Sequence, residues 1–220
     1  PVQKAMVECH ASQCGFCTPG FVMSLYSLWM ENPNPSKRDV EISVQGNLYR
    51  CTGYEPIINA ALSVNKYGNP TFDQLNTERE NIINKLSRLQ DDARVEIGDD
   101  NNKAILPANI DDLAQILQDR PNSTIVAGAT DVGLWVTKFL KPISPVLFIG
   151  QLTDLKKIEV NDDMLTFGAG VTYTEIQDYL SKFFPFLDNY WDRIAGWQVR
   201  NMRTIGGNIA NVSPMGDTQP

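Results

Sequence analysis

The sequence predicts an α+β multidomain protein in which an all-α four-helix bundle precedes an α/β domain. Three observations predict this class. The chain has 220 residues, 42% of them hydrophobic, which suffices for two cores. Its first third alternates apolar runs of helical length with capping and stop residues, whereas the part after residue 104 alternates short apolar strands with helices. We expect a helical domain at 1–75, a linker at 76–103 and an α/β domain at 104–220.

The charge and hydropathy of the chain exclude several partners. The formal net charge is −7, which argues against nucleic acid or an anionic membrane as the main partner. No apolar run approaches the ~18 residues that a membrane-spanning helix needs, and no signal-peptide layout opens the chain. We therefore expect a cytoplasmic protein.

The first two helices are expected on either side of a cysteine-containing turn. The first precedes Cys9. Thr18 is a suitable N-cap for the second and Pro19 a suitable first residue, and the Asn-Pro-Asn-Pro stretch at 32–35 ends it. Together they place a loop with three cysteines between two helices.

Two further helices complete the predicted bundle. Ser36 caps a short third helix that Gly46 ends. Thr52 and Glu55 form a capping box for the fourth helix, which runs on to Gly68. Four helices of these lengths predict a compact bundle.

A polar interval separates the helical pattern from the pattern of strands and helices that follows it. The stretch 72–90 is polar and at best amphipathic, and 91–104 is rich in Asp and Asn, which indicates a linker. The elements expected afterwards are strand, helix, turn, strand, loop and helix within 104–139, a buried strand at 145–150, a strand pair at 156–170 around an Asn-Asp-Asp turn, a helix at 172–184, and a helix leading into a glycine-rich loop within 192–210.

All four cysteines lie in the first quarter of the chain. QCGFCTPGF (13–21) and YRCTGY (49–54) each place a cysteine directly ahead of a threonine and an apolar helical run. The free N–H groups and dipole of a helix start favour thiolates and an anionic 2Fe–2S cluster. Zinc accepts the same ligands, and buried free thiols need no metal, so the spacing alone leaves all three open.

Two glycine-rich segments form a second group of candidate binding residues. They are IVAGATDVG (125–133) and RTIGGNIANVSPMGD (203–217). A glycine-rich turn after a strand lets backbone N–H groups approach a pyrophosphate closely. Gly206 and Gly207 are equally compatible with a plain tight turn. Neither segment has the Gly-x-Gly-x-x-Gly fingerprint, so a Rossmann site is disfavoured.

The cysteine segments, HASQCGFCTPGFVMSLYSL with GNLYRCTGYEPIINA, resemble the helical iron–sulfur domain of the molybdenum hydroxylases. The family pattern is Cys-Gly-x-Cys-Thr-Pro-Gly, then Gly-Asn-x-Cys-Arg-Cys-Thr-Gly-Tyr. The resemblance implies that Cys14, Cys17 and Cys51 ligate a 2Fe–2S cluster, while Tyr49 stands where the fourth cysteine belongs. It also implies that Gln13 lies toward a molybdopterin in a partner chain.

Three accounts of the fourth ligand remain open. Tyr49 supplies an oxygen, for which its ordinary pKa of ~10 is unfavourable. Alternatively, Cys9 or His10 moves in. In the third account the site is structural and holds no cluster.

The glycine-rich segments, taken together and in this order, resemble the FAD-binding domain of the same family. The pattern there is Ala-Gly-Gly-Thr-Asp, followed by Arg-Asn-x-x-Thr-x-Gly-Gly-Asn-x-x-x-x-Ser-Pro-x-x-Asp. Ala129 replaces the second glycine of the first motif, and Arg203 stands where a small residue is common. The residues that the resemblance assigns to FAD are Gly128, Thr130, Asp131, Thr204, Gly206, Gly207, Asn208, Asn211, Ser213 and Asp217.

The resemblance implies a role in electron transfer. The parent protein is expected to oxidise a purine such as hypoxanthine or xanthine at a molybdopterin centre on a separate large subunit, in a hetero-oligomer. Electrons then pass through two 2Fe–2S clusters to FAD and on to NAD. This chain supplies the second cluster domain and the front of the flavin domain, and we expect no catalytic residue in it because bonds break elsewhere.

The resemblance also predicts what surrounds this segment and leaves rival functions open. A plant-type ferredoxin domain is expected before Pro1 and the rest of the flavin domain after Pro220, so the segment alone should hold FAD weakly and be inactive. The rivals are a family member acting on an aldehyde, carbon monoxide or another heterocycle, an assembly scaffold without a cluster, and a structural zinc module.

Overall fold

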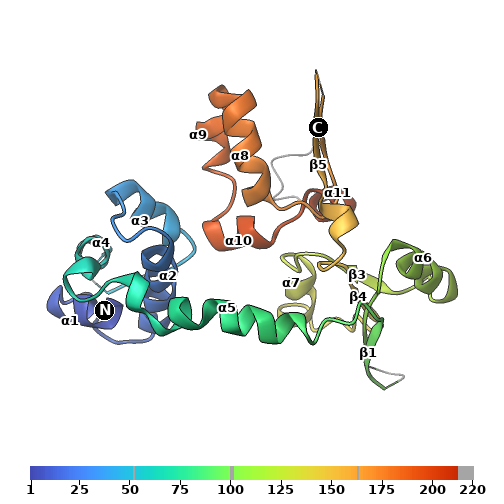
Figure 1. The fold of residues 1–220 in the computed structure, drawn as a ribbon, viewed down its shortest axis with the longest axis horizontal. Coiled ribbons are helices and arrows are strands. Elements are labelled where there is room, and N and C mark those ends of the chain that lie inside the picture. The colour runs from blue at the N-terminus through green and yellow to red at the C-terminus, as the bar shows by residue number, and fades with distance from the viewer. Residues whose placement is uncertain (52, 100–101, 163, 213–220) are drawn as a thin grey trace. The chain divides into compact units, whose positions relative to one another are not determined.

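The computed structural model describes residues 1–51, 53–99, 102–162 and 164–212. The chain divides into two compact units, Pro1–Gln90 and Asp91–Pro220 (Figure 1). This division falls inside the interval predicted as a linker. Each unit is described by itself.

The first unit is helical, and four of its helices share one hydrophobic core. In order the elements are α1 (Val2–Glu8), α2 (Thr18–Glu31), α3 (Lys37–Ser43), α4 (Glu55–Ser63), the 3₁₀ turns η1 (Val64–Lys66) and η2 (Pro70–Phe72), and α5 (Gln74–Ser87). The core contains Phe21 and Leu25 of α2, Val40 of α3 and Ile57 of α4, all at most 1% exposed. The predicted helices before Cys9 and after Ser36 are confirmed.

Side-chain capping explains the start of α3, whereas α2 and α4 begin without a side-chain cap. Ser36 forms a capping box with Asp39: the Asp39 N–H donates to Ser36 Oγ (3.2 Å) and the Ser36 N–H to Asp39 Oδ2 (2.8 Å). Helix α2 starts at Thr18 itself, because its N-cap is Cys17 rather than the predicted Thr18. The predicted cap Thr52 lies outside the described residues, and α4 begins at Glu55.

Helix α5 occupies much of the predicted linker and buries none of its side chains. Asp73 caps it by accepting the Leu75 N–H at 3.0 Å. The same carboxylate accepts the Tyr26 hydroxyl at 2.6 Å, and this hydrogen bond raises the pKa of Tyr26 to about 12. The start of α5 is thereby tied to α2.

The second unit opens with a four-stranded mixed sheet. Its strands are β1 (Val95–Gly98), β2 (Lys103–Leu106), β3 (Thr124–Val126) and β4 (Val146–Phe148), in the order β1-β2-β4-β3. β1 pairs antiparallel with β2, and β4 lies parallel between β2 and β3, in register Ile105↔Leu147 and Ile125↔Leu147. Helix α6 (Ile110–Asp119) follows β2, and Ile116 packs with Ile105 and Leu147.

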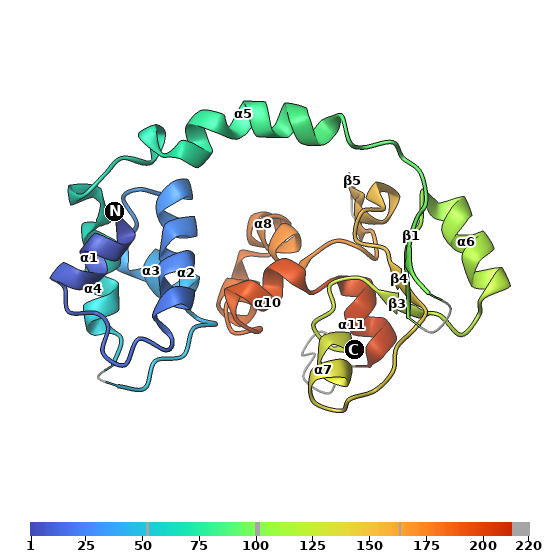
Figure 2. The same ribbon diagram turned by 90° about the horizontal axis from the view of Figure 1, so that it is seen from below.

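A hairpin and several helices complete the second unit. They are α7 (Val132–Thr137), η3 (Thr153–Lys156), β5 (Ile158–Asn161), β6 (Met164–Phe167), α8 (Tyr173–Phe183), η4 (Pro185–Leu187), α9 (Asp188–Trp191), α10 (Trp197–Met202) and α11 (Ile205–Asn211). β5 and β6 are the predicted antiparallel pair. α8 packs against α10, as both ribbon views show (Figures 1 and 2). A second core gathers Val171, Tyr173, Ile176, Trp191 and Ile194.

One prediction in this unit is wrong. Residues 205–211 form helix α11, not the glycine-rich loop expected after residue 203. The Thr204 side chain accepts the Gly207 N–H at 3.2 Å, and this cap starts the helix despite two glycines in its first turn.

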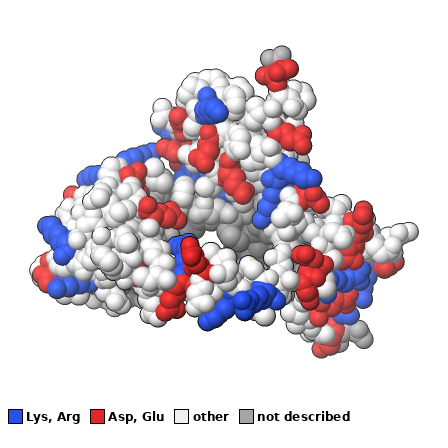
Figure 3. Space-filling model, viewed as in Figure 1, with Lys and Arg blue, Asp and Glu red and all other residues white. Residues whose placement is uncertain are grey.

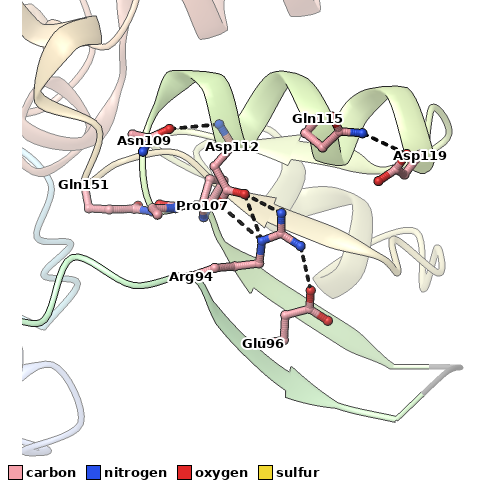
Figure 4. Close-up of polar contacts among 9 residues, drawn as sticks. Arg94, Glu96, Pro107, Asn109, Asp112, Gln115, Asp119 and Gln151 are labelled. Carbon is pink, nitrogen blue, oxygen red and sulfur yellow. Dashed lines mark hydrogen bonds and ion pairs between the residues drawn. The ribbon is translucent and has the colours of Figure 1, made fainter.

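Polar contacts tie the chain ahead of β1 to helix α6 (Figure 4). Arg94 Nε donates to Asp112 Oδ1 at 3.0 Å, and its Nη1 donates to Glu96 Oε1 at 3.4 Å. Asp112 Oδ2 also accepts the Ala108 N–H at 2.8 Å. Arg94 holds the pKa of Asp112 below its usual value, because its hydrogen bonds favour the carboxylate.

On the face shown in Figure 3, neither acidic nor basic side chains form one continuous charged patch. In Figure 3 acidic and basic side chains mix over β1 and α6, while the visible surface of α1–α4 is largely uncharged. None of the helices in the described part of the chain is both long and apolar enough to cross a bilayer.

Candidate functional site

Two loops of the first unit bring two cysteines together. Cys14, ahead of α2, and Cys51, ahead of α4, place their sulfur atoms 3.6 Å apart, and both side chains are exposed. Gly15 and Gly53 follow them with φ of +80° and +93°, and a Cβ at either would meet nothing within 4 Å. Glycine is needed there for backbone conformation rather than for space.

Side chains of the second motif fasten its loop onto helix α2. Ser24 Oγ donates to Asn47 Oδ1 at 2.9 Å. The Tyr54 hydroxyl accepts the Tyr49 N–H at 3.1 Å and donates to the Asn47 carbonyl at 3.3 Å. The first bond holds the segment that leads to Cys51 beside the middle of α2, and the other two bonds brace this segment internally.

Cys17, the third predicted ligand, is less exposed than Cys14 and Cys51. Cys17 is the N-cap of α2 and packs partly buried against the core. The pKa of Cys14 is lowered, first because its sulfur accepts the Phe16 N–H and second because the Cys51 thiol donates to it. Within the described residues no three His, Cys, Asp or Glu side chains stand close enough together to hold a metal ion.

Tyr49 lies in the hydrophobic core. It is 9% exposed, and its ring meets the rings of Phe21 and Tyr54 edge-on, at centroid distances of 6.2 and 6.1 Å. The other two candidates for a fourth ligand also have separate surroundings. Cys9 Sγ lies 3.8 Å from Ser63 Oγ, and His10 is exposed at φ +50°. The structure thus brings two of the three predicted thiol ligands together, at Cys14 and Cys51, while Tyr49 packs as a core aromatic residue.

The surroundings of the cysteines are exposed and apolar. Phe16 is 95% exposed and Leu48 is 82% exposed, and Gln13 is exposed beside Cys14. A cavity of about 680 Å³ adjoins this loop between α1 and α2, with Met6, Val7, Val22 and Met23 among its lining residues.

The two glycine-rich segments of the second unit meet at their backbones. Gly128 follows strand β3, and a Cβ placed on it would lie 1.6 Å from the carbonyl oxygen of Met202 and 3.2 Å from the Arg203 nitrogen. Only glycine permits this approach. The first predicted segment therefore lies directly against the start of the second.

The second segment is held by a neighbouring stretch that follows β6. The Gly206 N–H donates to the Ala169 carbonyl at 2.9 Å, and the Ile205 N–H donates to the Val171 carbonyl at 3.1 Å. A Cβ on Gly206 would approach the Ala169 Cβ to 2.6 Å. Residues 168–171 were not among the predicted site residues, although Gly-Ala-Gly directly after a strand was a visible signal.

The remaining predicted residues have varied positions. Thr130 and Asp131 are half-buried ahead of α7, Asn208 is 2% exposed, and Asn211 is the last residue of α11. Ala129 has φ +59°, a conformation that favours the glycine of the motif it departs from. Ser213 and Asp217 lie outside the described residues.

Comparison with protein families identifies both units. Residues 100–220 match the family described as the FAD binding domain in molybdopterin dehydrogenase, and residues 1–62 match a [2Fe-2S] binding domain. The two matches place the molecule in the class of iron–sulfur and flavin-binding components of oxidoreductases. The chain belongs to the molybdenum hydroxylase family and contains its 2Fe–2S-binding and FAD-binding domains.

The relatives in this family have several activities. The xanthine dehydrogenase of Calliphora vicina and the aldehyde oxidase 1 of Bos taurus are each 30% identical, and each alignment covers all of this chain and 20% of the relative. The chain thus spans about a fifth of the length of these curated relatives. A solved Cu,Mo-CO dehydrogenase is 26% identical, with a TM-score of 0.46, over 51% of this chain and 40% of that chain.

Proposed function

We propose that this chain is the electron-transfer part of a xanthine dehydrogenase, linking a molybdopterin centre to NAD through a 2Fe–2S cluster and FAD. The observation that carries the proposal is the pairing of Cys14 and Cys51 at 3.6 Å in a chain whose other unit joins two glycine-rich segments. Both the cluster-binding domain and the flavin-binding domain that such a relay needs occur in this chain.

In the first unit, Cys14, Cys17 and Cys51 hold the cluster. A bound 2Fe–2S cluster supplies one-electron acceptance and release. The chain contributes the thiolates, and the lowered pKa of Cys14 favours its ligating form. The helix starts of α2 and α4 favour negative charge at the same place.

In the second unit, the segments at 127–131 and 203–208 border the flavin. Gly128 and Gly206 keep the backbones close, and Thr204 fixes the start of α11. The assigned FAD residues Thr130, Asp131, Gly207, Asn208 and Asn211 lie in these segments or in the helix that follows. Ser213 and Asp217 belong to the same proposed set.

We also propose that a molybdopterin-containing subunit or domain covers the cysteine loop. Phe16 and Leu48 are almost fully exposed there, and burying apolar surface of this size would exclude water from the cluster. Gln13 would then face the pterin. A purine is the proposed substrate of that partner, and an aldehyde is the main alternative.

A second candidate function has a specific observation in its favour. Tyr49 is a buried core residue at the position of the family's fourth cysteine, which favours a domain that has lost its cluster and serves assembly. Iron content separates the two functions.

The experiment is metal, sulfide and absorption analysis of the full-length protein. We expect flavin in the visible spectrum together with the iron and acid-labile sulfide of two 2Fe–2S clusters, and loss of one cluster's iron in Cys51→Ser, because the ferredoxin domain expected ahead of this segment would keep its own cluster. Cys9→Ser is the matched control, because that sulfur lies beside Ser63 and should leave iron unchanged. A wild-type protein with flavin but with the iron of one cluster only would support the scaffold, and stoichiometric zinc would support a structural zinc module.

A further inference from the structure

Arg203 is a buried cation at a position where the family motif commonly has a small residue. The residue joins α10 to α11 in the chain and is only 7% exposed. None of the roles proposed above uses it. A charged group so deeply buried requires compensation from its surroundings.

The described surroundings compensate Arg203 only in part. Its Nη2 donates to Asn208 Oδ1, and its guanidinium lies over the Tyr173 ring, 5.2 Å from the centroid. Its buried Nε has no hydrogen-bond partner, and no carboxylate pairs with it among the residues that the structure describes. An amide oxygen and an aromatic face stabilise a guanidinium less than an anion does.

Arg200, the other buried arginine of this segment, also has a buried Nε that makes no hydrogen bond, but the partners of its Nη1 differ from those of Arg203. Its Nη1 donates to the carbonyl oxygens of Trp191 and Asp192 at 3.4 and 3.2 Å. Its guanidinium also lies over the Trp197 ring. Arg200 therefore ties α10 to α9, whereas the hydrogen bond of Arg203 runs to Asn208 in α11.

Arg203 lies where the two glycine-rich segments meet. Its backbone nitrogen is 3.2 Å from the position of a Cβ on Gly128, and its carbonyl accepts the Tyr173 N–H at 3.0 Å. Its guanidinium contacts Asn208, one of the residues assigned to FAD. An anion bound between the segments would therefore find this cation beside it.

We propose that Arg203 binds a phosphate oxygen of the FAD pyrophosphate, as an additional anion-binding residue particular to this chain. This rests on the proposed flavin function of the second unit. A guanidinium provides several fixed N–H donors and suits phosphate geometry, so the unpartnered Nε and the buried charge would both be satisfied. No bond is made or broken in this step.

The test compares flavin binding in deflavinated full-length protein. Arg203→Ala restores a small residue like that of the family motif and should raise the Kd for FAD by about tenfold to a hundredfold, the usual loss for a charge-assisted hydrogen bond. Riboflavin, which has no phosphate, should bind wild type and variant equally. Arg203→Lys should recover most of the FAD affinity. Arg193→Ala, at an exposed arginine of the same region, is the matched control.

The outcomes are distinguishable. Equal FAD affinity in wild type and Arg203→Ala would overturn the inference and leave the flavin function standing. Equal losses of FAD and riboflavin would show a structural role only and also overturn it. A folded wild type that binds no FAD would instead contradict the proposed function.

Two further measurements keep the inference testable if Arg203→Ala does not fold. Arg203→Gln keeps a donor to Asn208 without the charge, so it should lose FAD affinity while Arg203→Lys does not; equal affinities would overturn the inference. Inorganic pyrophosphate should displace FAD from wild type but leave riboflavin bound.

Discussion

The cysteine loops of the first unit and the glycine-rich segments of the second are built on different principles. The cysteine site is defined by side chains: exposed thiols at the tips of two loops approach to 3.6 Å. The proposed flavin region is defined by backbone: Gly128 and Gly206 lie against main-chain atoms of neighbouring segments. A single side-chain change therefore affects the two sites very differently.

The departures from the family motifs illustrate this contrast. A tyrosine at position 49 removes a possible donor outright, and its ring joins the hydrophobic core. In the second unit, Ala129 and Arg203 also depart from the motif, yet the backbone contacts at Gly128 and Gly206 remain. A site made of backbone tolerates new side chains wherever the close approaches themselves are kept.

The sharpest way to break the backbone-defined site is Gly128→Ala. The added methyl would overlap the Met202 carbonyl oxygen at 1.6 Å, so the two segments must separate. We expect destabilisation of the second unit by about 3 kcal/mol, at the upper end for overpacking. Flavin retention should fall with it, as followed by thermal unfolding and flavin absorbance of the full-length protein.

Gly133→Ala is the matched control for that variant. It lies five residues further on in α7, where an added Cβ meets nothing within 4 Å. It should retain flavin and gain slightly in stability, because alanine favours a helix over glycine. Equal behaviour of the two alanine variants would disprove the close approach at Gly128.

The side-chain-defined site is tested by Tyr49→Cys. Restoring the family's fourth cysteine should raise iron occupancy and the low-temperature EPR signal after reduction. Removal of a buried aromatic ring should simultaneously lower stability by about 3 kcal/mol. Tyr49→Phe keeps the packing against Phe21 and loses only the hydroxyl. If Tyr49→Phe loses iron and Tyr49→Cys gains none, the tyrosine is itself a ligand and the lost-ligand account fails.

The smallest expected effect is that of Ala129→Gly. Ala129 has φ +59°, a left-handed conformation that costs an L-residue about 1 kcal/mol. Glycine should relieve this strain, and after subtraction of about 0.4–1 kcal/mol for its greater unfolded-state entropy the second unit should gain at most about 0.6 kcal/mol. Chemical denaturation of the full-length protein measures it, and a loss of stability would contradict a left-handed Ala129.

Local signals in the sequence predicted much of the fold. Ser36 predicted the capped start of helix α3, and the structure adds that Asp39 completes a capping box there. The alternating pattern at 156–170 specified the β5–β6 pair. Helix α11 could not be predicted in this way, because two glycines oppose a helix locally. Its start is positioned by hydrogen bonds that the backbone N–H groups of Ile205 and Gly206 donate to the carbonyls of Val171 and Ala169, which are far away in the sequence.

The sequence by itself determined the family and the residue types at both sites, because motifs record chemistry at fixed spacing. Only the tertiary structure decided that Cys14 and Cys51 adjoin, that the Tyr49 ring packs in the core, and that Arg203 is buried beside Asn208. The physical reason is that burial and contact depend on which distant segments pack together, and neighbouring residues in the chain do not carry that information.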